Sequence, residues 1–126
     1  MLFRPCLALA MLAPLPAVAF GNLDCITFES CADTGCTPQT TPFAVDFDWA
    51  ANTATVTVDD TVHALPWIAT GETDDGLASV LDYGNMEADA RLLRIEARGL
   101  DITALYSFQN PSVTTWHATC DVRQAA

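Results

Sequence analysis

The sequence predicts an all-β fold: an antiparallel barrel or sandwich of about eight short strands, stapled by disulfides. Apolar and polar residues alternate in several short segments, which is the period of a half-buried strand. Turn-forming residues separate these segments at intervals of roughly 8 to 12 residues, as in sandwiches and barrels. Cys25, Cys31 and Cys36 lie within twelve residues and Cys120 lies near the end of the chain, so a disulfide is expected to join the two ends of the domain.

Residues 1–19 have the features of a secretory signal peptide. Arg4 supplies the positive charge, residues 7–15 form a short apolar stretch, and Ala17-Val18-Ala19 is a cleavage site of small residues. We therefore expect residues 20–126 to form a single β-domain that is secreted or periplasmic.

The cysteines beyond the signal are Cys25, Cys31, Cys36 and Cys120, an even number in an oxidising compartment. Of the three possible pairings, we favour Cys25–Cys120 with Cys31–Cys36. In the chain-entropy model a loop of about 96 residues contributes roughly 4 to 5 kcal/mol, and a six-residue loop about 2 kcal/mol. The spacings do not match a zinc knuckle.

The expected strands follow the alternation, and the expected turns follow Gly, Asn, Asp and Pro. Pro66 has no N–H to donate to a ladder, so it predicts an edge strand or a bulge. The segment around Cys31 and Cys36 is expected to form a stapled loop. The strands are expected at 25–29, 43–49, 54–58, 61–68, 77–83, 102–108 and 113–120, and the turns at 51–52, 59–60, 71–76, 84–85 and 110–112.

Residues 86–98 fit two structures. As a helix, the segment has Asn85 as an N-cap and Gly99 as a stop. As a strand, it points Leu93, Ile95 and Ala97 inward and the charged residues between them outward. We favour the strand, because residues 99–101 then turn directly into the next expected strand.

The expected mature chain is strongly acidic. Four arginines face sixteen acidic residues, a net charge of about −12, and the chain has no lysine. This charge disfavours nucleic acids and anionic membranes as partners, and the missing lysine excludes a Schiff-base nucleophile and a phosphate-binding P-loop. We expect a basic protein or peptide as partner. The sequence does not indicate an oligomeric state.

No pattern of residues indicates a catalytic site. His63 and His117 lie in separate expected strands without metal-ligand spacing, and the serines lack a nucleophile-elbow motif. Asp46 and Asp48 share a strand face, as paired acids or hard-cation ligands do, but an alternating acidic face is normally solvated. We expect no catalytic residues, and an enzyme using acidic side chains is an alternative.

The one candidate metal site is an acidic loop. Glu72, Asp74 and Asp75 lie beside Gly76, a composition suited to calcium, although the spacing is not that of an EF-hand. A calcium-stabilised structural domain is therefore a second alternative, and no other cofactor is expected.

The three tryptophans also fit two roles. Trp49, Trp67 and Trp116 fit either a core or a ligand pocket at a barrel mouth, and strand positions favour the core.

Two motifs carry a resemblance to known proteins. The early Cys25-Ile-Thr-Phe-Glu-Ser-Cys31 cluster and the ending Thr-Thr-Trp-His-Ala-Thr-Cys120, after Ala-Leu-Tyr-Ser-Phe108, resemble small secreted β-domain proteins of Gram-negative bacteria without an assigned function. The architecture is similar to periplasmic inhibitors of C-type lysozyme, although their serine- and glycine-rich inhibitory loop has no counterpart here. The resemblance implies a non-enzymatic periplasmic binding or inhibitory module.

Overall fold

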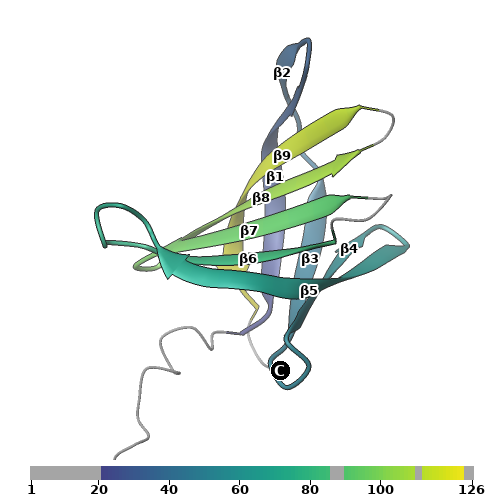
Figure 1. The fold of residues 1–126 in the computed structure, drawn as a ribbon. Coiled ribbons are helices and arrows are strands. Elements are labelled where there is room, and N and C mark those ends of the chain that lie inside the picture. Colours follow the sequence, from purple (N-terminus) through teal and green to yellow (C-terminus); the bar gives the residue numbers. More distant parts are fainter. Residues whose placement is uncertain (1–20, 86–89, 110–111, 124–126) are drawn as a thin grey trace, which may run out of the picture.

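The computed structural model describes residues 21–85, 90–109 and 112–123, and these form an all-β domain (Figure 1). No helix within these residues is long and apolar enough to cross a membrane. The strands are β1 (Leu23–Ala32), β2 (Gly35–Pro38), β3 (Pro42–Asp48), β4 (Thr53–Val58), β5 (Thr61–Glu72), β6 (Ser79–Asn85), β7 (Arg91–Arg98), β8 (Asp101–Gln109) and β9 (Val113–Val122).

The strands form a closed antiparallel barrel. From β3 to β9 each strand pairs with the next along the chain, and β1 closes the sheet by pairing with both β3 and β9. Eight strands make the barrel, and the short β2 pairs with β1 alone and projects from it (Figure 1). The sequence predicted either a barrel or a sandwich, and the β1–β9 pairing shows that the sheet closes into a barrel.

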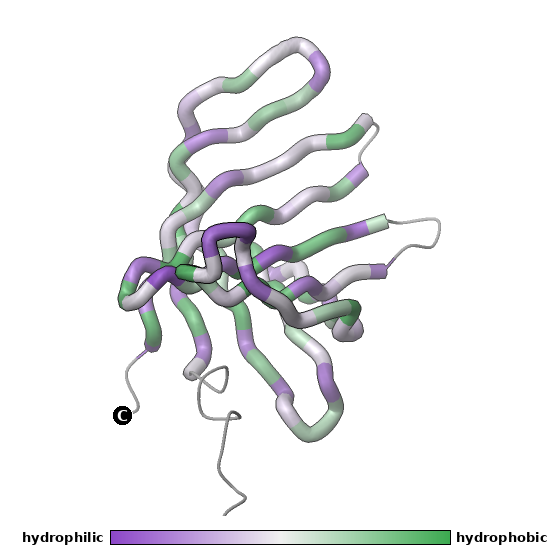
Figure 2. Tube along the Cα trace, turned by 60° about the vertical axis from the view of Figure 1, so that its left-hand side comes forward, coloured by the Kyte–Doolittle hydropathy of each residue, from purple (hydrophilic) through white to green (hydrophobic). Residues whose placement is uncertain are grey.

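The barrel interior is filled by one alternate set of side chains. Figure 2 shows hydrophobic and hydrophilic residues alternating along the strands. Eight strands enclose a space that side chains can fill. The largest fully buried side chains are Tyr83, Tyr106, Leu23, Leu65, Leu93 and Ile95. Among the described residues, Thr27 is the one buried polar residue. It exchanges two hydrogen bonds with Thr41: Thr27 N–H donates to the Thr41 carbonyl at 3.0 Å, and Thr41 N–H donates to Thr27 Oγ1 at 2.7 Å.

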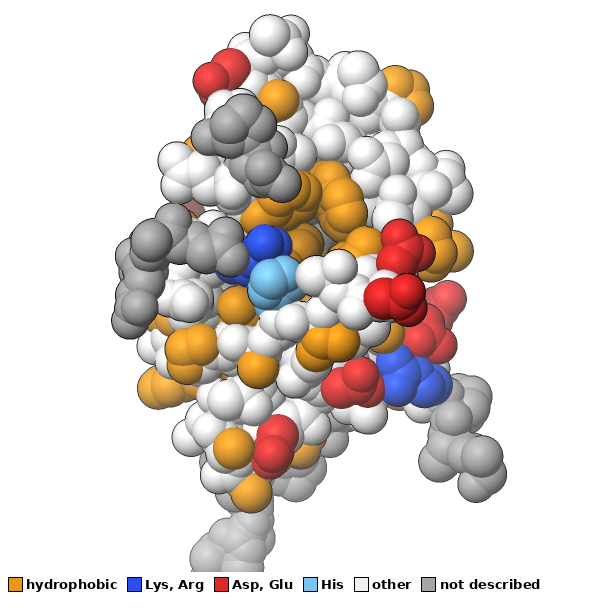
Figure 3. All heavy atoms as spheres, turned by 90° about the vertical axis from the view of Figure 1, so that its right-hand side faces the viewer, with side chains coloured by type: hydrophobic (Ala, Val, Ile, Leu, Met, Phe, Trp, Pro, Cys, Tyr) orange, Lys and Arg blue, Asp and Glu red, His pale blue; other side chains and the backbone are white. Residues whose placement is uncertain are grey.

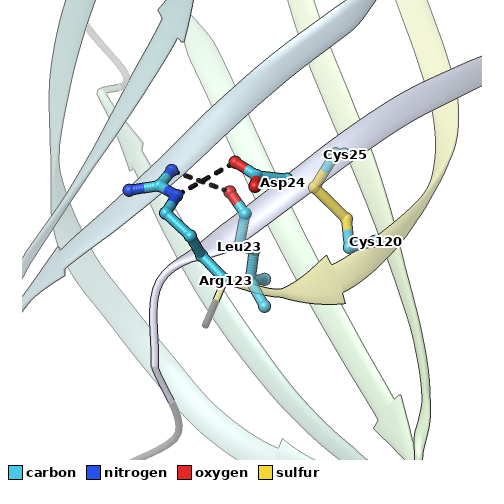
Figure 4. The surroundings of a disulfide bond; sticks show 5 residues. All are labelled: Leu23, Asp24, Cys25, Cys120 and Arg123. Carbon is cyan, nitrogen blue, oxygen red and sulfur yellow. Dashed lines mark hydrogen bonds and ion pairs between the residues drawn. A yellow bond between two sulfur atoms is a disulfide. The ribbon is translucent and has the colours of Figure 1, made fainter. Parts of the chain in front are cut away.

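The seam between the first and last barrel strands is closed covalently. Cys25 and Cys120 are register partners in the β1–β9 ladder and form a disulfide, which is the pairing favoured by the cysteine spacing (Figure 4). Beside it, the Arg123 guanidinium contacts Asp24 at 3.0 Å and Asp46 at 2.8 Å. The two carboxylates raise the pKa of Arg123. The C-terminal strand is thus tied to both β1 and β3.

The second disulfide, Cys31–Cys36, lies in a hairpin instead of the expected loop. β1 continues to Ala32 beyond its pairing with β3, and β2 pairs with this part of β1 so that Cys31 and Cys36 are directly opposite. The predicted Cys31–Cys36 bridge is confirmed, but the expected loop is a hairpin, because the tight turn at residues 33–34 leaves the flanking backbone free to pair.

The strand assignment of residues 91–98 is confirmed. Leu93 and Ile95 are buried in β7, and residues 86–89 of the ambiguous segment lie outside the described residues. The expected turn at Gly84-Asn85 was wrong, since both residues pair in the β6–β7 ladder. A Cβ on Gly84 would lie 2.8 Å from the Arg91 carbonyl oxygen, so this glycine permits a close backbone approach.

Pro66 lies just before a bulge, one of the two alternatives predicted for it. β5 has neighbours on both sides, and its pairing with β6 shifts between Trp67 and Ala69. The turns expected at 51–52 and 59–60 are confirmed, with Asn52 and Asp59 at positive φ (56° and 53°). Asn and Asp tolerate this backbone conformation better than most residues. Residues 110–111 of the last expected turn lie outside the described residues.

Candidate binding site on the outer barrel face

The predicted calcium ligands lie at the β5–β6 connection, where Asp75 is held within the turn. Asp75 accepts hydrogen bonds from the Thr73 hydroxyl at 2.5 Å and the Leu77 N–H at 2.9 Å. Arg98 of β7 donates to its second oxygen at 3.1 Å. These bonds, the Thr73 bond first, lower the pKa of Asp75 from 3.8 to about 2. Asp75 therefore stabilises the turn itself.

Glu72, Asp74 and Asp75 do not converge on one point. Within the described residues, the only three metal-ligand side chains whose donor atoms lie within 4.8 Å of one another are Glu29, Cys31 and Cys36, and the two sulfurs form a disulfide. The calcium hypothesis stays a prediction.

The paired aspartates of β3 serve different neighbours. Asp46 contacts Arg123 across the seam, and Asp48 accepts a hydrogen bond from the Ala51 N–H at 3.0 Å in the β3–β4 turn. His63 pairs with Val56 on the β4–β5 ladder, whereas His117 lies on β9 with its ring 6.2 Å from Phe28. β5 and β9 are not neighbours in the sheet, so the fold does not bring the two imidazoles together through strand pairing.

Only one of the three tryptophans packs against the core. Trp116 lies in an aromatic cluster with Phe43, Tyr106 and Phe108, with ring centroids 5.1 to 6.1 Å from its own. Trp49 and Trp67 are 39% and 47% exposed, so the core prediction was wrong for them. β3 ends before Trp49, and the bulge after Pro66 interrupts the alternation at Trp67.

The aromatic cluster extends toward one end of the barrel. The Arg91 guanidinium lies 5.7 Å from the centre of the Phe108 ring and donates to the Tyr106 hydroxyl at 3.0 Å. Figure 3 faces this right-hand end of Figure 1 and shows apolar side chains gathered at its centre, beside a basic side chain and a histidine. A small apolar hollow of about 110 Å³ lies at this end beside Arg91 and Phe108, and two larger hollows lie on the outer barrel face.

The first hollow is an acidic depression of about 420 Å³ on the outer face of β5, β6 and β7. Glu72, Asp74, Asp82 and Glu96 contribute carboxylates to its lining, and Arg94 is the only basic residue there. Arg94 binds Asp82 through two bonds of 2.7 and 2.9 Å, which raise the pKa of the guanidinium. With its one cation held by one of its carboxylates, the depression has a net charge of −3.

The second hollow adjoins the first and is more apolar. It measures about 280 Å³ and lies over β7, β8, β9 and β1. Phe28, Leu105 and His117 line it, and Arg94 and Glu96 line both hollows. The two hollows therefore meet along the outward-facing side chains of β7.

Bulges border both hollows. The shift between Thr27 and Glu29 in the β1–β9 ladder leaves Phe28 without a register partner, and the side chain is 53% exposed. The shift after Trp67 in the β5–β6 ladder precedes the β5 segment that lines the acidic hollow. Bulges bend a strand and re-aim side chains, and they are common beside functional sites.

The outer face was not predicted as a site. Glu72 and Asp74 were singled out as calcium ligands, whereas Asp82, Arg94, Phe28 and Leu105 were not. One signal was present: Ile26 and Phe28 alternate with the inward Cys25 and Thr27, which places two large apolar residues on the solvent face. No family model, curated protein or solved structure shows a significant match to this chain.

Proposed function

We propose that the protein is a secreted, non-enzymatic binding or inhibitory module of the periplasm, and that its partner is a basic protein or peptide. The two disulfides suit an oxidising compartment outside the cytoplasm. The lysozyme inhibitors that the sequence resembles have such a basic partner, and C-type lysozyme is the first candidate to test.

The observation that carries this proposal is the distribution of charge. Most of the described acidic side chains are exposed, whereas Arg94, Arg98 and Arg123 are each paired with carboxylates of the same chain. The unbalanced carboxylates produce a negative field that accelerates encounter with a cationic partner. The acidic hollow on β5–β7 offers the partner's basic side chain a concave contact.

The experiment compares the binding of C-type lysozyme, another basic protein and a neutral protein at low, physiological and high salt. We expect saturable binding of a basic partner that persists at physiological ionic strength and weakens as salt shortens the Debye length to about 3 Å near 1 M. The neutral protein is the control. If every basic protein binds equally weakly and all binding disappears at physiological salt, the charge only promotes solubility and the proposal fails.

A further inference from the structure

We infer that the two adjoining hollows form one docking groove for a cationic amphipathic segment, in which a basic side chain lies next to an apolar one. This inference rests on the proposed function and narrows its partner class. A purely polar polycation fits only the acidic half of the groove, whereas an amphipathic segment fits both halves.

The acidic half recognises charge. Glu72 and Asp74 are exposed at the end of β5 and the following turn, while Asp82 is already engaged by Arg94. The Glu96 carboxylate already has a basic neighbour, because the Arg98 guanidinium of the same strand lies 3.7 Å from it. Glu72 and Asp74 are therefore the carboxylates best placed to receive a basic side chain from a partner.

The apolar half recognises an aliphatic or aromatic side chain. Phe28 is exposed at the β1 bulge, and Ile26, two residues before it on the same outward face, is 51% exposed. His117 packs beside Phe28, and Leu105 of β8, the register partner of His117, lines the same hollow. Exposed aromatic residues in concave surroundings are typical anchor positions in protein interfaces.

The two halves are held at a fixed spacing. Arg94 and Glu96 project from β7, which is paired on both sides within the closed barrel. The bidentate Arg94–Asp82 pair fixes the side chain that divides the halves. A rigid groove loses little conformational entropy on binding, which favours affinity without a large contact area.

The test uses two synthetic peptides of equal length and charge, one alternating lysine with phenylalanine and one alternating lysine with serine. We expect the wild-type protein to bind the lysine–phenylalanine peptide about tenfold more tightly at physiological salt. Phe28→Ala is expected to remove most of this difference without changing affinity for the lysine–serine peptide. Leu105→Ala removes a second apolar side chain from the same hollow and is expected to act in the same direction.

Matched variants distinguish the effect of groove residues on peptide affinity from the effect of losing an apolar side chain or a charge elsewhere on the surface. Leu100→Ala removes a 98% exposed side chain in the β7–β8 turn and is expected to change neither affinity. Glu72→Gln/Asp74→Asn is expected to weaken both peptides several-fold more than Asp59→Asn/Asp60→Asn, which removes the same charge from the β4–β5 turn. Unchanged melting temperatures of the variants establish that they are folded.

Each outcome separates the inference from the proposed function. Saturable wild-type binding of both peptides with equal affinity overturns the amphipathic groove and leaves the proposed function standing. If Phe28→Ala, like Leu100→Ala, changes the affinity for neither peptide, the amphipathic groove is also overturned. Absence of saturable binding of either peptide, together with failure of basic proteins to bind, overturns both.

Discussion

The two disulfides have the same chemistry but lie in contrasting regions of the molecule. Cys25 and Cys120 are 1% and 6% exposed, in the core cluster at the β1–β9 seam. Cys31 and Cys36 lie in the β1–β2 hairpin, whose β2 residues are all exposed. The first bridge joins residues 95 apart in sequence and the second joins residues 5 apart. In the chain-entropy model, the bridge that closes the longer loop removes more freedom from the unfolded chain and therefore stabilises the fold more.

The largest effect is expected from Cys25→Ala/Cys120→Ala. Loss of the long loop closure should lower the free energy of unfolding by roughly 4 to 5 kcal/mol in the chain-entropy model. Loss of buried sulfur packing adds to this. Denaturant unfolding followed by tryptophan fluorescence measures the change. Non-reducing peptide mapping of the wild type checks the premise, and a Cys25–Cys31 link would contradict it.

A smaller effect is expected from Cys31→Ala/Cys36→Ala. The six-residue loop predicts a loss of about 2 kcal/mol, with the barrel ladders intact because β2 pairs with β1 alone. Denaturant unfolding should show a lower midpoint, and the far-ultraviolet circular dichroism should remain that of the wild type. A loss as large as that of the seam variant would mean that the hairpin supports barrel closure, and the contrast between the two regions would be lost.

The smallest effect is expected from Asp75→Asn, which breaks a non-covalent link between the β5–β6 turn and β7. The pKa of Asp75 falls from 3.8 to about 2 on folding, so its ionised form stabilises the folded state above about pH 4. This contribution is lost as the pH falls from 3.8 through about 2. The variant should therefore melt slightly below the wild type at neutral pH, and the two should converge near pH 2.

Thermal melts between pH 2 and pH 7 make this measurement. Asp59→Asn, which removes one charge from the β4–β5 turn, is the control for a change in net charge alone. A difference that persists unchanged to pH 2 would show that the ionisation of Asp75 does not stabilise the turn.

The strands could be predicted because their signal is local. The alternation from Phe43 to Phe47, and the inward Leu93 and Ile95, follow from the two-residue period of a strand with one buried face. The Gly84-Asn85 turn failed because a glycine also permits close packing of backbones, and the sequence alone does not distinguish these uses. The core prediction failed for Trp49 and Trp67 because a strand end and a bulge, respectively, interrupt the two-residue period there.

The sequence by itself determined the strand period, the acidic excess and the cysteine distribution, because each depends on residue type and spacing along the chain. Only the tertiary structure decided that the sheet closes as a barrel and that Phe28 and Glu72 line adjoining hollows. The reason is that β1 and β9 lie at opposite ends of the domain in sequence but pair in the sheet. Bulges in the β1–β9 and β5–β6 ladders also change the direction of the neighbouring side chains. Long-range register of this kind leaves no periodic signal in the sequence.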